Sequence, residues 1–221
     1  MTASSWLWRS LLVGAAVLLF LGGPLHPKPD PGVSFEAASA KMLADPGWVP
    51  SHGLMLATHV LLAFGFFGLT RRVRLSGAAR IAGWFAVVGA ALSAIEMSFH
   101  LGAVVELDAL VAGRPTPIFL THLVLATLAQ PLLGFSVAAL AVLGARRRGV
   151  IDLVIGLIGA IGGLAHGLAA PIVVATRDQS FSFLFPGVVL LTPWLLWIAA
   201  RSMRSTRTST DLEPASLAPQ P

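Results

Sequence analysis

Six long apolar stretches constrain the fold of this chain more than any other feature of its sequence. The stretches run over 5–23, 51–70, 79–104, 117–144, 150–175 and 181–200. Each is close to the ~20 residues with which a helix crosses the hydrocarbon of a bilayer. Backbone groups in that hydrocarbon must be hydrogen-bonded within the protein, so these stretches should be helical. The sequence predicts an all-α integral membrane bundle of six transmembrane helices.

Composition agrees with a membrane protein and excludes several kinds of site. Of 221 residues, 56% are hydrophobic and 11% are charged, whereas a soluble domain carries about 25% charged residues. The chain has no cysteine, which excludes disulfides, thiolate metal sites, iron–sulfur clusters and covalently attached c-type haem. It also has no tyrosine, so tyrosyl-radical chemistry is excluded.

The basic residues predict the orientation of the bundle. With the N-terminus inside, the inner side collects Arg9, Arg71, Arg72, Arg74, Arg80, Arg146, Arg147, Arg148, Arg201, Arg204 and Arg207. The outer side receives Lys28, Lys41, Arg114 and Arg177. Cytoplasmic loops of membrane proteins are rich in lysine and arginine, so both ends should be cytoplasmic, in a multi-pass protein of the plasma membrane. Because these charges flank apolar runs and form no single basic surface, nucleic acid is not an expected partner.

Two segments lie outside the expected helices. In the outer loop 24–50, a short amphipathic helix is expected over 34–44, with Ser34 as its N-cap and Pro46-Gly47 after its end. It could cover the outer mouth of the bundle as a lid or rest on the membrane interface. Residues 1–203 should form the transmembrane domain. Residues 204–221, rich in Ser, Thr and Pro, should form a disordered cytoplasmic tail.

All histidines fall in the outer half of the expected bundle. His26 and His52 lie at the outer boundary. At about 1.5 Å per helical residue, His100 and His122 lie roughly 7 Å inside it, and His59, His166 and Glu96 roughly 11–13 Å inside it. Ionisable side chains in hydrocarbon usually face the bundle interior or a wet cavity. This asymmetry is the main functional signal in the sequence.

Spacing along the helices suggests that these side chains face inward together. Glu96 and His100 are four residues apart and therefore share a helix face. His166 is in line with glycines that mark a packed face, and His122 with alanines. Imidazoles from four helices and one carboxylate are thus expected to converge beneath the outer surface: His59, His100, His122, His166 and Glu96.

The first functional hypothesis is a b-type haem protein active in electron transfer or small-molecule redox chemistry. Haem iron takes axial imidazoles from facing helices and needs no cysteine. His59 with His166 is the preferred pair, because their depths match, and His100 with His122 is the second. The glycine face of the helix over 150–175 would accommodate a flat macrocycle.

The second hypothesis is a porphyrin-free Zn, Cu or Fe site held by His59, His100, His122, His166 and Glu96, since imidazole suits all three metals. Such a site could serve metal handling or hydrolysis, with Glu96 as candidate acid or base. A non-catalytic membrane subunit, an assembly factor or a transporter is the remaining alternative, and whether the chain is an enzyme stays open. The expected partners are the lipid bilayer and either a second copy of the chain or a membrane redox protein.

Overall fold

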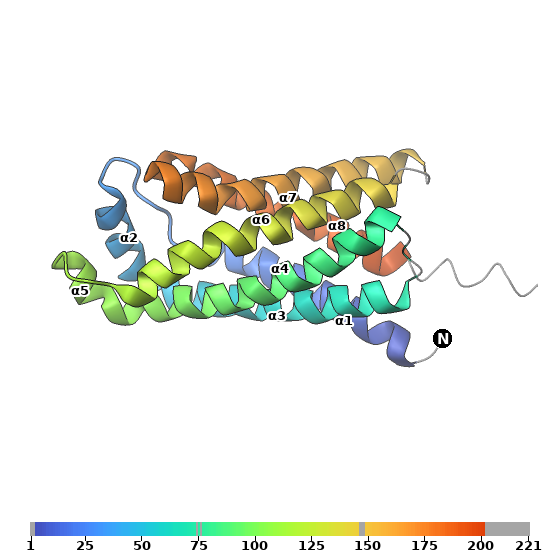
Figure 1. Ribbon diagram of the computed structural model, residues 1–221, viewed down its shortest axis with the longest axis horizontal. Coiled ribbons are helices and arrows are strands. Elements are labelled where there is room, and N and C mark those ends of the chain that lie inside the picture. Colours follow the sequence, from blue (N-terminus) through green and yellow to red (C-terminus); the bar gives the residue numbers. More distant parts are fainter. Residues whose placement is uncertain (1–2, 74, 76, 146–148, 202–221) are drawn as a thin grey trace, which may run out of the picture.

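The computed structural model describes residues 3–73, 75, 77–145 and 149–201, and within them it is all helical, without a strand (Figure 1). The elements in chain order are α1 (Ala3–Leu25), α2 (Phe35–Leu43), α3 (Trp48–Arg72), α4 (Gly77–Gly102), η1 (Ala103–Glu106), α5 (Leu107–Val111), α6 (Pro117–Ala145), α7 (Val150–Thr176), η2 (Gln179–Leu190) and α8 (Leu191–Arg201). Among these described residues, six helical segments are long and apolar enough to cross a membrane. The predicted all-α membrane bundle is confirmed.

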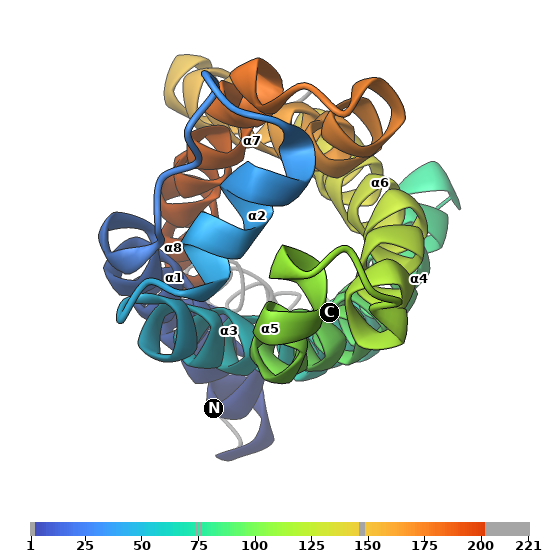
Figure 2. The ribbon, with the colours of Figure 1, turned by 90° about the vertical axis from the view of Figure 1, so that its left-hand side faces the viewer.

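The six spans form a closed ring. Along the chain α1 packs against α3, α3 against α4, α4 against α6, and α6 against α7. The sixth span, made of η2 and α8, packs against α7 and returns to α1. Figure 2 shows this ring end-on. Side chains on the inner faces of different helices can therefore meet near one central axis.

The sixth span differs from the expected continuous helix over 181–200. Its first half is the 3-10 helix η2, and only its second half, α8, is α-helical. Pro186 lies within η2, and proline has no N–H to give to an α-helical hydrogen bond. Hydropathy reports the length of an apolar stretch but does not distinguish these two helix types.

The predicted short helix exists and covers the end of the ring opposite the first residues of α1 and the last of α8, which is the end expected to face outward (Figure 1). α2 begins after Ser34, whose hydroxyl accepts a hydrogen bond from the N–H of Ala37 at 3.3 Å. Phe35 and Leu43 are buried in an outer apolar cluster with Trp48 and residues of η1, α6 and α7. Figure 2 shows α2 and α5 lying across this end of the ring. This position is the one that the lid interpretation expects, and the lid role itself stays a prediction.

Glycines let α6 and α7 approach closely. A Cβ added to Gly134 would lie 2.4 Å from the carbonyl oxygen of Gly163 and 2.5 Å from the amide nitrogen of Gly167. Farther along α7, a Cβ on Gly159 would lie 2.5 Å from Trp194. The expectation that these glycines leave room for a macrocycle is therefore wrong, because neighbouring helices already fill that space.

At the other end of the bundle, an ion pair joins α7 to α8. Arg201 Nη1 lies 2.7 Å from Asp152 Oδ2, and the indole N–H of Trp197 donates to Asp152 Oδ1 at 3.0 Å. The first residues of α1 and the last of α8 lie at this same end (Figure 1). That this end is cytoplasmic stays a prediction. The expected tail 204–221 lies outside the described residues. So do six of the arginines on which the predicted orientation rests: Arg74, Arg146, Arg147, Arg148, Arg204 and Arg207.

Candidate metal site

A buried carboxylate and two imidazoles meet between α4 and α6. Glu96 is 0% exposed, and its Oε1 lies 2.6 Å from Nδ1 of His122. His100, one turn further along α4, places its Nδ1 3.7 Å from the same oxygen. One ligand atom from each of the three residues lies within 4.8 Å of the others. We refer to them as the Glu96–His100–His122 group.

Small residues on α4 bring this group together. A Cβ added to Gly89 would lie 2.6 Å from the backbone nitrogen of Leu133, so α4 and α6 nearly touch there. Ser93 continues the same face of α4 and is fully buried. Because α4 and α6 are this close at Gly89, the side chains on the following turns of α4 contact those of α6. Glu96 consequently meets His122 directly.

A row of aromatic rings connects the group with the outer loop. The His100 and His122 rings stack with centroids 3.6 Å apart, and His52 meets His100 at 4.4 Å. Trp48 stacks on His52 at 3.8 Å, and His26 lies 4.8 Å from His52. The sequence left the roles of His26 and His52 open. The structure places His52 against His100 of the Glu96–His100–His122 group, and His26 against His52.

The hydrogen bonds of α3 fix the tautomers of two histidines. Nδ1 of His52 lies 2.7 Å from the carbonyl oxygen of Trp48, and Nδ1 of His59 lies 2.8 Å from that of Met55. A carbonyl oxygen only accepts, so Nδ1 carries the hydrogen in both rings. Each neutral ring therefore carries its lone pair on Nε2, where it can bind a metal or accept a proton.

Several buried polar atoms around the group have no hydrogen-bond partner within the described part of the chain. Among them are Glu96 Oε2, His100 Nδ1, His52 Nε2 and Trp48 Nε1. Buried polar atoms are normally satisfied, and clustered exceptions often mark a site for water or an ion. Three of these four atoms are potential acceptors or metal ligands, which is the expected chemistry of a cation site.

His59 and His166 form a second, deeper pair. His59 comes from α3 and His166 from α7, on opposite sides of the bundle. Their imidazole centroids lie 6.1 Å apart, and the imidazole planes are 28° from parallel. His166 Nε2 is buried without a hydrogen-bond partner among the described residues. The five residues expected in one layer are thus found as a group of three and a pair. The acid or base role of Glu96 stays a prediction.

His26 is the histidine of the row that lies outside the membrane spans. Its Nδ1 lies 2.7 Å from the carbonyl oxygen of Pro27. Burial lowers the pKa of His26 below its ordinary value, and the hydrogen bond to Pro27 opposes this only in part. Burial therefore favours the uncharged ring, which does not repel a cation.

The Glu106 carboxylate is a structural feature of this region that the sequence did not reveal. It accepts hydrogen bonds from the first free amides of α6, Ile118 N at 3.1 Å and Phe119 N at 2.9 Å. Glu106 comes from η1, before the short helix α5. A carboxylate at a helix N-terminus satisfies free amides and complements the helix dipole. It anchors the outer turn of α6, the helix that carries His122.

No protein-family model, curated protein or solved structure matches the chain. Two imidazoles and one carboxylate form a donor set that proteins use for catalytic zinc and for non-haem iron. The residues present could therefore hold a metal ion.

Proposed function

We propose that the chain is a multi-pass plasma-membrane protein that binds a divalent transition-metal ion through Glu96, His100 and His122, beneath its outer face. The observation that carries the proposal is the fully buried Glu96 carboxylate, 2.6 Å from His122 and 3.7 Å from His100. A carboxylate in hydrocarbon needs a compensating positive charge or a proton. A cation bound by all three residues supplies that charge and engages the unpartnered Glu96 oxygen.

The bound ion would sit beneath a lid and at the end of the histidine row. The row from His26 through His52 offers imidazole nitrogens between the outer loop and Glu96. These nitrogens suit Zn, Cu and Fe alike. Metal acquisition or transfer at the outer face is the role that this arrangement supports best.

Haem b held by His59 and His166 is the second candidate. These two imidazoles, on facing helices, would hold the haem iron, which would supply redox chemistry. The observation that favours it is the close approach of the two rings, whose centroids lie 6.1 Å apart. The glycine-mediated contact of α6 with α7 opposes a macrocycle beside His166. The His100–His122 pair, at 3.6 Å, is too close to hold an iron between its rings.

The test is metal content, measured by elemental analysis of the protein purified in detergent, together with its absorption spectrum. We expect about one metal ion per chain and no Soret band. Glu96→Gln and His122→Ala should each lower the metal affinity at least tenfold and therefore reduce the metal retained on purification, because each removes one ligand. Ser93→Ala, which removes a buried hydroxyl from the same face of α4, is the matched control and should retain the metal.

The other outcomes separate the alternatives. A Soret band that is lost in His166→Ala would support haem and overturn the porphyrin-free site. Colourless protein without metal, unchanged by these substitutions, would overturn both cofactor proposals. It would leave a non-catalytic membrane subunit, an assembly factor or a transporter.

A further inference from the structure

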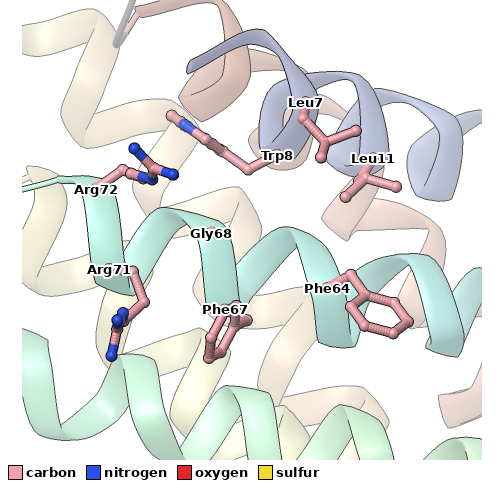
Figure 3. Close-up of a pocket in the computed structure, with 8 residues that line it drawn as sticks. All are labelled: Leu7, Trp8, Leu11, Phe64, Phe67, Gly68, Arg71 and Arg72. Atoms are coloured by element: carbon pink, nitrogen blue, oxygen red, sulfur yellow. The ribbon is translucent and has the colours of Figure 1, made fainter. Parts of the chain in front are cut away.

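A groove of about 740 Å³ lies between α1 and α3, away from the histidines. Figure 3 shows it with its lining side chains, which are Leu7, Trp8, Leu11, Phe64, Phe67, Gly68, Arg71 and Arg72. Its volume falls in the range of roughly 300–1,000 Å³ that is typical of small-molecule sites. The groove belongs to the half of the bundle that holds the Asp152–Arg201 ion pair.

The wall of the groove is apolar and faces outward from the bundle. Leu7 is 63% exposed and Phe64 62% exposed. Its floor exists because a glycine lets α1 and α3 touch: a Cβ added to Gly68 would lie 2.4 Å from Cβ of Trp8. In a membrane-spanning bundle, such a surface is in contact with lipid acyl chains.

One end of the groove carries two exposed arginines, Arg71 and Arg72, on the last turn of α3 (Figure 3). The guanidinium of Arg71 lies 5.7 Å from the ring centre of Phe67. Neither arginine forms an ion pair with a carboxylate in the part of the chain that the structure describes. By contrast, Arg201 is paired with Asp152, and Arg177 with Glu36. The groove therefore ends in positive charge that no carboxylate of the described chain balances.

We propose that this groove binds an anionic phospholipid, with an acyl chain along the apolar wall and the phosphate at Arg71 and Arg72. Guanidinium groups bind phosphate oxygens through paired hydrogen bonds, and basic pockets between transmembrane helices bind anionic head groups. The site is independent of the proposed metal site, since the two share no residue.

A second groove of the same chain provides a contrast. It has a volume of about 640 Å³, lies between α4 and α6, and has no charged side chain in its lining. Leu128, Pro131 and Phe135 are among its residues. This groove should accept acyl chains without preference for the head group, because hydrophobic contact is not selective for charge.

The experiment counts bound lipid by native mass spectrometry of the full-length protein, titrated with phosphatidylglycerol or phosphatidylcholine. The wild type should bind one phosphatidylglycerol more tightly than phosphatidylcholine. Each of Arg71→Gln and Arg72→Gln should weaken phosphatidylglycerol binding about fivefold, since one basic residue near a membrane surface contributes on the order of 1 kcal/mol. Leu11→Trp, which fills the groove, should weaken binding of both lipids.

Two matched variants locate the site. Arg80→Gln removes an exposed arginine at the start of α4, outside the groove, and Leu128→Trp fills the second groove; both should keep the selectivity of the wild type. Equal affinity of the wild type for the two lipids would overturn the proposal. So would an Arg80→Gln effect as large as that of Arg71→Gln, or complete displacement of the lipid by inorganic phosphate.

Discussion

At the scale of single residues, the burial of the Glu96 carboxylate is the main argument for a bound cation among the histidines. Its side chain is fully buried within a membrane span, and only one of its oxygens has a close histidine partner. The hydrogen bond to His122 satisfies Oε1, while Oε2 has no partner among the described residues. A cation that binds both the carboxylate and the two imidazoles would satisfy more of these atoms than hydrogen bonds within the group can.

Removing His122 should destabilise the metal-free protein. His122→Ala leaves a second oxygen of Glu96 buried without its partner, and an unsatisfied buried polar group costs about 1–3 kcal/mol. The measurement is the free energy of unfolding from a detergent titration of protein stripped with a chelator. The double variant Glu96→Gln/His122→Ala should lose less stability than the two single variants added together. Strictly additive losses would show that the two side chains do not interact.

The sequence predicted some of these contacts and missed others for a geometrical reason. The four-residue spacing of Glu96 and His100 placed both on one face of α4, and the structure has both in the group. The closer partner is nevertheless His122, at 2.6 Å compared with 3.7 Å. That contact depends on how α4 and α6 are rotated against each other, which the approach of Gly89 to Leu133 determines. Spacing within one helix carries no information about this rotation.

At the scale of elements, the packing of α6 on α7 organises the side of the ring that carries His122 and His166. The contact is made backbone to backbone at Gly134, Gly163 and Gly167. In a membrane, such close approach supplies much of the packing energy between helices, because apolar side chains gain little by leaving lipid. The small-residue faces that the sequence revealed are therefore contacts between helices. The space beside Gly163, where a macrocycle was expected, is occupied by α6.

Gly134→Ala should separate these two helices. The added methyl group would meet backbone atoms of Gly163 and Gly167 at 2.4–2.5 Å, and backbone cannot move aside as a flexible side chain can. We expect a loss of about 1–3 kcal/mol in the free energy of unfolding, as is usual for overpacking. Gly144→Ala on the same helix, where a Cβ meets nothing within 4 Å, is the control. Equal stability of the two variants would contradict this account of the interface.

At the scale of the whole molecule, hydropathy predicted the six spans but not which helices are neighbours. The depth of each histidine in a membrane stays a prediction. His59 and His166 lie on α3 and α7, which stand across the ring from each other. Glu96 and His122 lie on adjacent helices. One layer of histidines therefore divides into a group of three and a facing pair. The row through His52 to His26 was also hidden, because it depends on how His26, Trp48 and His52 pack against one another.

The most direct measurement for the metal proposal is the X-ray absorption spectrum of the bound metal in the purified protein, recorded at that metal's own edge. The proposal predicts a first shell of nitrogen and oxygen at about 2.0–2.2 Å, with the outer-shell scattering of two imidazoles. In Glu96→Gln this signal should vanish or change its oxygen contribution. The scattering pattern of a porphyrin, a shell without imidazole, or protein with no bound metal would contradict it.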